Sequence, residues 1–221
     1  MSSQASAFAQ DSSSSSMPQA IPVVFVVDDD ISVRESLELL IRFAGWQVEL
    51  FASAQEFLAH PRPAVPSCLV LDVNLPGLNG LDLQKRIAGE RADMPIIFIT
   101  GYGDVPRTVQ AMKAGAVEFL TKPFDDDVLL RAIGSAIERS RTALDHEQGL
   151  RSLRQAHASL TPREHEVMAM VVAGRLNKQI AADLGISVKT VETHRSRMME
   201  ALGCRNASEL LRVAMRHHDR P

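Results

Sequence analysis

Cysteine and aromatic residues are scarce in this chain of 221 residues, which has two cysteines, one tryptophan and one tyrosine. Because Cys68 and Cys204 both lie in apolar sequence, we expect no disulfide framework and a reducing compartment. No apolar run approaches the roughly 20 residues that a membrane span needs. The first residues also lack the charged and then apolar pattern of a secretion signal. We therefore expect a cytoplasmic protein without a membrane partner.

A strong excess of charge of one sign is also missing, since the net charge is −3. The charges are nevertheless unevenly distributed. Residues 21–140 hold 11 Lys and Arg against 17 Asp and Glu, whereas residues 159–221 hold 10 against 7. This asymmetry and the chain length predict two domains with different partners. Residues 1–20, rich in Ser, Ala and Gln, are predicted to be a disordered tail, and the polar residues 141–158 a linker with weak helical character.

Short apolar segments alternate with amphipathic helical segments throughout residues 21–140. The expected strands are 23–27, 46–51, 68–72, 96–99 and 117–120. The expected helices cover 33–44, 54–59, 80–90, 105–116 and a segment after Asp125. Alternation of this kind predicts a doubly wound, flavodoxin-like parallel sheet of five strands with helices on both faces.

Four of the expected strands end in polar residues. Asp28 and Asp29 follow the first strand, Asp72 ends the third, Thr100 follows the fourth and Lys122 follows the fifth. Ligands of open α/β sheets bind beyond the carboxyl ends of the strands, so we expect these side chains to share one crevice.

Several carboxylates in one crevice repel each other unless a cation neutralises them, and Mg²⁺ prefers such oxygen ligands. We expect Asp29 and Asp72 to bind Mg²⁺ directly, Asp28 through water, and Asn74 through its backbone carbonyl. The Asp72 carboxylate could then attack phosphorus and form an aspartyl phosphate. Lys122 and Thr100 would contact the phosphoryl oxygens.

Nearby acidic residues have simpler roles. Asp30 is predicted to cap the first helix. We expect Asp125, Asp126 and Asp127 to stabilise the N-terminus of the fifth helix through its dipole rather than to bind metal.

Residues 22–140 resemble a response-regulator receiver domain. The motifs that carry the resemblance are Val-Asp28-Asp29, Leu-Asp72-Val-Asn-Leu-Pro-Gly, Ile-Thr100-Gly and Phe119-Leu-Thr-Lys122-Pro123-Phe. The resemblance implies that Asp72 accepts phosphate from a sensor histidine kinase and that Lys122 precedes a cis proline. It also implies that Thr100 and Phe119 move together on phosphorylation, although Phe replaces the commoner Tyr. The stretch from Thr100 to Pro106 is similar to the FixJ subgroup.

The last part of the chain is predicted to be a small all-α domain. Its expected helices are 161–174, 177–184, 188–202 and 206–217, the first with a capping box from Thr161 and Glu164. The second and third helices, joined by a short turn with Gly185, form a helix-turn-helix unit.

The helix expected at 188–202 carries an inward apolar stripe and an outward polar row. Glu192, Thr193 and Ser196 are predicted to contact base edges. Four cations are predicted to contact phosphates: Lys178, Lys189, Arg195 and Arg197. Thr190 completes the predicted DNA-binding residues. We interpret His194 as a packed structural residue.

Residues 160–215 resemble the LuxR/NarL-type output domain, through Leu-Thr161-Pro-Arg-Glu-His-Glu-Val, Asn177-Lys178-Gln-Ile-Ala and Ser187-Val-Lys-Thr-Val-Glu-Thr-His194-Arg. Both resemblances together imply a transcription factor switched by phosphorylation. It would dimerise when phosphorylated and bind double-stranded DNA, with RNA polymerase as a further candidate partner. It would have no enzymatic activity beyond accepting and slowly losing phosphate.

Two alternatives remain open at this point. A Mg²⁺-dependent phosphohydrolase would use a second Asp two residues after the nucleophile, and that position is Asn74, which cannot act as a general acid. A regulator independent of phosphorylation would use the first domain only for docking. The complete set of crevice residues speaks against the second alternative.

Overall fold

The computed structural model describes residues 21–61, 64–101, 105–206, 208–210 and 212. The chain divides into two compact units between Leu144 and Asp145, each with its own apolar core. In the described ranges, no helix is long and apolar enough to cross a membrane.

The first unit is built on a five-stranded sheet in which every pair of neighbouring strands is parallel. Its strands are β1 (Val23–Val27), β2 (Gln47–Phe51), β3 (Ser67–Asp72), β4 (Ile96–Thr100) and β5 (Glu118–Thr121). Their order across the sheet is β2-β1-β3-β4-β5. The predicted fold class is therefore confirmed.

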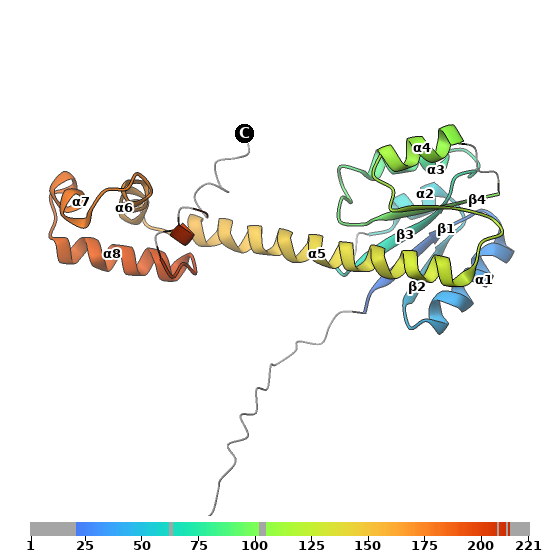
Figure 1. Cartoon of the computed structure of the whole chain (residues 1–221), viewed down its shortest axis with the longest axis horizontal. Coiled ribbons are helices and arrows are strands. Elements are labelled where there is room, and N and C mark those ends of the chain that lie inside the picture. Colours follow the sequence, from blue (N-terminus) through green and yellow to red (C-terminus); the bar gives the residue numbers. More distant parts are fainter. Residues whose placement is uncertain (1–20, 62–63, 102–104, 207, 211, 213–221) are drawn as a thin grey trace, which may run out of the picture. The chain divides into compact units, whose positions relative to one another are not determined.

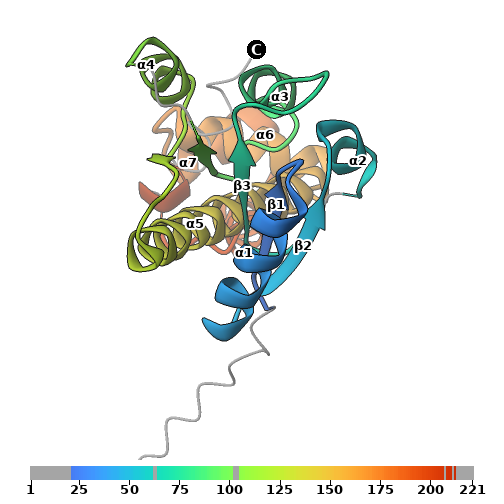
Figure 2. The same cartoon turned by 90° about the vertical axis from the view of Figure 1, so that its right-hand side faces the viewer.

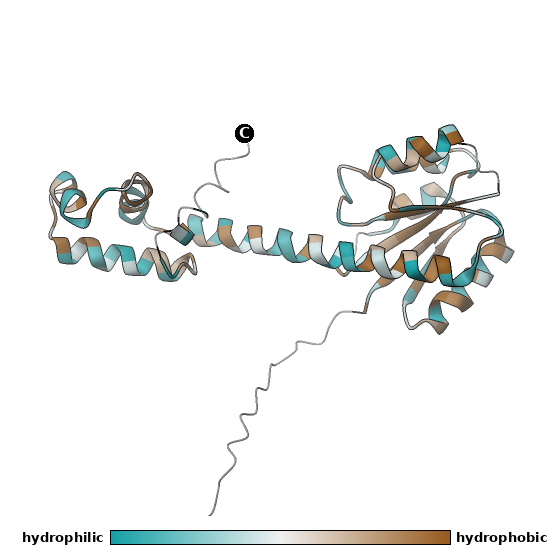
Figure 3. Cartoon of the chain, viewed as in Figure 1, coloured by the Kyte–Doolittle hydropathy of each residue, from teal (hydrophilic) through white to brown (hydrophobic). Residues whose placement is uncertain are grey.

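Helices cover both faces of this sheet. They are α1 (Ile31–Phe43), α2 (Ala54–Ala59), α3 (Gly80–Ile87), α4 (Val105–Lys113) and α5 (Asp126–Ala158). The helices α2, α3 and α4 cover one face, and α1 and the first part of α5 cover the other (Figures 1 and 2). The central strands β1, β3 and β4 are buried along their whole length, and the strands are coloured as hydrophobic in Figure 3. Burial on both faces explains their continuous apolar sequences.

The helix α5 is longer than the sequence pattern indicated. Residues 141–158, which we predicted to be a linker, continue this helix without a break. Its first part packs on the sheet through five buried apolar residues: Leu129, Ala132, Ile133, Ala136 and Ile137.

The second unit contains α6 (Pro162–Val172), α7 (Asn177–Leu184) and α8 (Val188–Ala201). Thr161 and Glu164 form the expected capping box at the start of α6. Gly185, with φ of 63°, makes the left-handed turn that lets α8 follow α7 closely. Of the predicted last helix, 206–217, a large part lies outside the described residues; residues 208–210 and 212 are helical.

Candidate functional site

Polar side chains from three strand ends meet at the carboxyl edge of the sheet. Lys122, just after β5, donates hydrogen bonds from Nζ to Asp28 Oδ2 at 2.6 Å and to Asp72 Oδ2 at 2.9 Å. Asp28 follows β1 and Asp72 ends β3, two neighbouring strands. The structure therefore brings together the carboxylates and the lysine that the sequence placed on separate strands.

Asp29 completes an acidic cluster with these two carboxylates. One carboxylate oxygen from each of Asp28, Asp29 and Asp72 can be chosen so that the three lie within 4.8 Å of one another. Asp28 and Asp72 are buried, whereas Asp29 is exposed. Three oxygen donors at the solvent boundary fit Mg²⁺, which keeps part of its water shell.

Burial sets the electrostatics of this cluster. It raises the pKa of Asp28 above its ordinary value, even though hydrogen bonds from Lys122 and the Asp30 backbone oppose the shift. For Lys122, burial alone would lower the pKa, but the hydrogen bonds with Asp28 and Asp72 outweigh it and raise the pKa. Lys122 therefore remains a cation and neutralises part of the carboxylate charge.

Thr100 and Asn74 lie beside the acidic cluster. Thr100, at the end of β4, is fully buried, and its Oγ1 accepts a hydrogen bond of 3.2 Å from Asn74 Nδ2. The backbone N–H of Asn74 donates to Asp72 Oδ1 at 2.9 Å. Both oxygens of the Asp72 carboxylate therefore accept hydrogen bonds, which fixes the orientation of the group.

Three contacts around the crevice were not predicted. Arg107 of α4 donates from Nη1 to Asn74 Oδ1 at 3.2 Å, and Arg34 of α1 donates from Nη1 to the Asp28 carbonyl at 2.6 Å. A Cβ at Gly80 would lie 2.4 Å from the Asp72 carbonyl oxygen, so the start of α3 packs tightly against the end of β3. These contacts depend on where α1, α3 and α4 pack, which no strand-end pattern encodes.

Other predicted positions have the expected local structure. Asp30 caps α1, since its side chain accepts a hydrogen bond from the Ser32 backbone. The Lys122–Pro123 peptide bond is cis. Phe119 on β5 is half-buried, and its ring lies 6.1 Å from that of Phe98.

The second unit presents the outer face of α8. Val191 and Met198 are buried and hold α8 against the core of this unit. The polar positions predicted to face DNA are exposed: Lys189, Glu192, Thr193, Ser196 and Arg197. Lys178, on α7, is exposed as well, and Thr190 is half-buried. One helix thus offers both the short polar groups and the cations that a major-groove contact uses.

Some of these side chains have contacts within the protein. Arg195 is half-buried and donates from Nη1 to Asn177 Oδ1 at 2.6 Å, which ties α8 to α7. Lys189 lies 3.6 Å from Glu192, an exposed pair that costs little to separate. His194 is half-buried, and its Nδ1 has no hydrogen-bond partner among the described residues.

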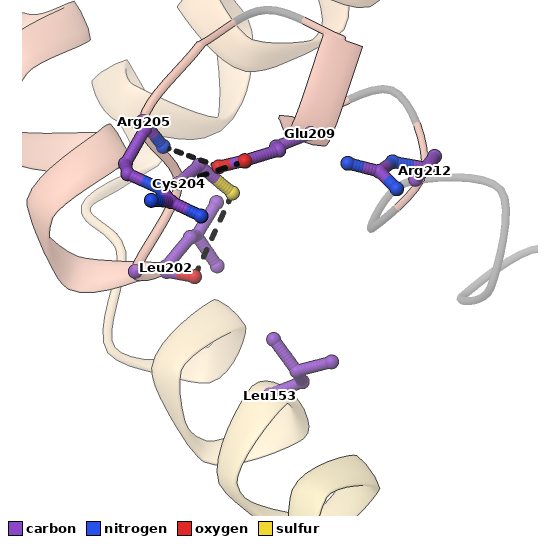
Figure 4. Close-up of a pocket in the computed structure, with 7 residues that line it drawn as sticks. Leu153, Leu202, Cys204, Arg205, Glu209 and Arg212 are labelled. Atoms are coloured by element: carbon purple, nitrogen blue, oxygen red, sulfur yellow. Dashed lines mark hydrogen bonds and ion pairs between the residues drawn. The ribbon is translucent and has the colours of Figure 1, made fainter.

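A separate hollow of the second unit, shown in Figure 4, lies near the end of α8. Glu209 accepts a hydrogen bond of 2.7 Å from the backbone of Arg205 there. Cys204 Sγ donates to the Leu202 carbonyl at 3.6 Å, and burial raises the pKa of this thiol. None of the predicted site residues lines this hollow.

Comparison with known proteins places each unit in a family. Residues 24–134 match the response regulator receiver domain, and residues 158–214 match the bacterial regulatory proteins of the luxR family. Together these two matches span most of the chain.

Proteins with both regions are among the relatives. The chain is 48% identical over 192 residues to nodulation protein W of Bradyrhizobium diazoefficiens, covering 87% of this chain and 85% of that protein. It is 44% identical over 193 residues to the transcriptional regulatory protein FixJ of the same organism, covering 87% and 94%. A solved structure of response regulator StyR aligns with a TM-score of 0.80 at 45% identity, covering 89% of this chain and all of that one.

Proposed function

Since this chain belongs to the response regulators that join a receiver domain to a luxR-type DNA-binding domain, we propose that Asp72 is its phosphoacceptor and that phosphorylation drives dimerisation and DNA binding. The observation that carries the assignment is the position of Asp72, whose carboxylate lies 2.9 Å from Lys122 and within 4.8 Å of two other carboxylates. A sensor histidine kinase would supply the phosphoryl group.

The residues around Asp72 have separate roles in the proposed phosphoryl transfer. An Asp72 oxygen attacks the phosphorus of the kinase phosphohistidine, forming an O–P bond while the P–N bond breaks and the electron pair leaves with the imidazole. Hydrogen bonds from Lys122 and from the Asn74 backbone hold the attacking carboxylate in place. Lys122 can then neutralise phosphoryl charge without a large movement.

The acidic cluster is the proposed Mg²⁺ site. Asp29 and Asp72 would bind the ion directly, Asp28 through water and Asn74 through its backbone carbonyl. When bound, Mg²⁺ would supply positive charge that offsets the charge of the carboxylates and of the phosphoryl oxygens. The three carboxylates support this proposal because they provide hard oxygen ligands within one crevice.

Thr100 and Phe119 are the proposed switch. The Thr100 hydroxyl lies in the crevice, where it could turn toward a phosphoryl oxygen, and Phe119 is on the adjacent strand β5. A movement of Thr100 would leave space that the half-buried ring of Phe119 could enter. This coupling would carry the change from the crevice to the outer side of β5.

The surface formed by α4 and β5 is the proposed dimer interface. Three apolar side chains of α4 are exposed, with Val105 at 76%, Val109 at 45% and Met112 at 44%. β5 is an edge strand of the sheet. A dimer would place two α8 helices about one DNA turn, roughly 34 Å, apart.

DNA contacts follow from the outer face of α8. Glu192, Thr193 and Ser196 are proposed to reach base edges, and Thr190 to lie at the rim of the contact. The cations proposed to contact phosphates are Lys178, Lys189, Arg195 and Arg197. DNA as a partner and two free buried cysteines support a cytoplasmic location, where a bound dimer could contact RNA polymerase.

Acetyl phosphate with Mg²⁺ tests this proposal. We expect stable labelling at Asp72, a shift from monomer to dimer, and tighter binding to a target DNA fragment. Switching a mostly inactive population requires phosphate to favour the active state by about 5 kcal/mol. Asp72→Asn, which keeps the size of the side chain, should lose all three responses. Full regulation by the Asp72→Asn protein would instead favour a receiver that serves only for docking, and fast turnover of phosphate would favour a phosphohydrolase.

A further inference from the structure

Arg107, in the first turn of α4, reaches the crevice from a helix, whereas the acidic residues and Lys122 come from strand ends. Its Nη1 donates to Asn74 Oδ1 at 3.2 Å, and Nδ2 of the same amide donates to Thr100 Oγ1 at 3.2 Å. Three side chains from α4, the loop after β3 and the end of β4 therefore form one chain of hydrogen bonds.

The guanidinium group determines which end of the Asn74 amide faces Thr100. Arginine can only donate hydrogen bonds, so the amide oxygen must face Arg107 and the NH₂ group must face Thr100. Without this constraint, the amide could turn by 180° and present its oxygen to the same hydroxyl. Arg107 thus makes Thr100 Oγ1 an acceptor in this contact.

This contact opposes the proposed movement of Thr100. A displacement of Thr100 toward a phosphoryl group on Asp72 would lengthen or break this hydrogen bond of 3.2 Å with the Asn74 amide. We propose that Arg107 is a positioning residue, which acts through Asn74 to hold Thr100 in its unphosphorylated place and so sets the threshold of the switch. The inference rests on the proposed function, because it gives Thr100 the role of the switch.

The test compares Arg107→Met with Arg86→Met, which removes an exposed arginine of α3. Loss of one partly exposed hydrogen bond should shift the unphosphorylated population toward the switched state by about threefold to tenfold. We expect sedimentation of the unphosphorylated full-length protein to show tighter dimerisation by this factor for Arg107→Met alone. The rate of labelling by acetyl phosphate should rise, and the Asn74 amide signals should move in a ¹H–¹⁵N spectrum.

A double-mutant cycle with Asn74→Ala separates this role from a direct one, because it removes the intermediary side chain. If Arg107 acts through Asn74, adding Arg107→Met to Asn74→Ala should change dimerisation no further. An equal effect of Arg107→Met in both backgrounds would overturn the inference and place Arg107 in the interface itself. Slower labelling of Asp72 in the Arg107→Met protein would also overturn the inference, since it would indicate that Arg107 contacts the phosphoryl group.

Failure of the proposed function would be recognised separately. The amide signals and the coupling between Arg107 and Asn74 are measured without a phosphodonor. Labelling of Asp72 is measured in the unsubstituted chain. If Asp72 is not labelled but Arg107→Met has no effect in the Asn74→Ala background, the assignment of Asp72 as phosphoacceptor is wrong. The positioning role of Arg107 toward Asn74 would then still hold.

Discussion

The carboxylate of Asp28 lies in the crevice at a cost to stability. Asp28 is buried, and the environment of the folded protein raises its pKa although Lys122 and a backbone N–H stabilise the carboxylate. The balance of these effects therefore penalises the charged form of Asp28 in the folded protein relative to the unfolded chain. Retention of a charged group under such conditions is typical of a functional site rather than of a structural one.

We predict that Asp28→Asn stabilises the metal-free protein at neutral pH. Because the folded-state pKa of Asp28 is raised, its contribution to stability is complete below the ordinary value of 3.8 and is lost as the pH rises through the raised value. The amide carries no such loss and can still accept the hydrogen bond from the Asp30 backbone.

Urea denaturation in EDTA, followed from pH 3 to pH 7, tests this prediction. The advantage of Asp28→Asn should be absent at the acidic end and grow toward neutrality. Asp29→Asn, at an exposed position, is the matched control and should change stability less. A less stable Asp28→Asn protein at pH 7 would show that the Lys122 pairing outweighs burial.

Gly80, at the start of α3, has no room for a side chain. An alanine methyl group would lie 2.4 Å from the Asp72 carbonyl oxygen, so α3 or the end of β3 must shift. We expect Gly80→Ala to reduce the free energy of unfolding by about 1–3 kcal/mol and to slow phosphorylation of Asp72. Gly134→Ala, in α5, is the control: a Cβ there meets no atom within 4 Å, and alanine should stabilise the helix by about 0.5–1 kcal/mol. Equal stability of both variants in urea would contradict the close packing at Gly80.

At the scale of helices and strands, the sequence predicted those elements whose signals are local. Buried apolar runs that end in polar residues located β1, β3 and β4, and therefore the crevice. The capping box located the start of α6. Fold class and crevice residues could be predicted because each depends on a short pattern repeated along the chain.

Elements that lack a strong local signal, or that depend on distant partners, were less predictable. Residues 141–158 contain no proline, and Gly149 does not interrupt the helix. Ion pairs such as Glu147 with Arg151 at 2.7 Å follow helical spacing. The mixed polarity of residues 141–158 indicated a linker all the same. On α4, an apolar stripe does not reveal whether it faces the core or solvent, and Val105 and Val109 are exposed. Arg107 escaped notice for the same reason, because its contact with Asn74 depends on the packing of α4.

The capping box of α6 makes the stability of the second unit depend on pH. Glu164 accepts hydrogen bonds from the backbone N–H and the hydroxyl of Thr161, and these bonds lower the pKa of Glu164. The resulting stability is present above the ordinary pKa of 4.5 and is lost as the pH falls through the lowered value. We expect Thr161→Ala to destabilise the second unit by about 1 kcal/mol at pH 7, and Glu164→Gln to remove the pH dependence.

The single tryptophan permits a clean measurement of the capping effect. Trp46 is half-buried and packs against the core of the first unit, so its fluorescence reports the unfolding of that unit, whereas circular dichroism reports both. Thr161→Ala should shift the dichroism transition and leave the fluorescence transition in place. A shift of both transitions would mean that the two units unfold together.

For the whole molecule, the uneven distribution of charge assigns different partners to the two units. The acidic first unit holds the proposed cation site, and the second unit, with 10 Lys and Arg against 7 Asp and Glu in residues 159–221, carries the proposed contacts with DNA phosphates. The electrostatic part of DNA affinity depends on the number of phosphates that a protein neutralises, and one copy offers four proposed phosphate contacts. Two copies on one DNA fragment double the phosphate contacts, which is why dimerisation would control DNA binding.

The salt dependence of DNA binding measures this doubling directly. Each phosphate contact adds about 0.9 to the slope of log affinity against log salt concentration, so loss of Lys189 or Arg197 from one bound copy should lower the slope by about 0.9. In a bound dimer, each substitution occurs twice and the slope should fall by about 1.8. We therefore expect Lys189→Ala and Arg197→Ala to weaken binding of the phosphorylated protein similarly on all sequences, with this larger change. Glu192→Ala should alter the preferred DNA sequence and should not lower the slope. A change near 0.9 for the phosphorylated protein would mean that one copy binds, and phosphorylation would then have to act on α8 within the monomer.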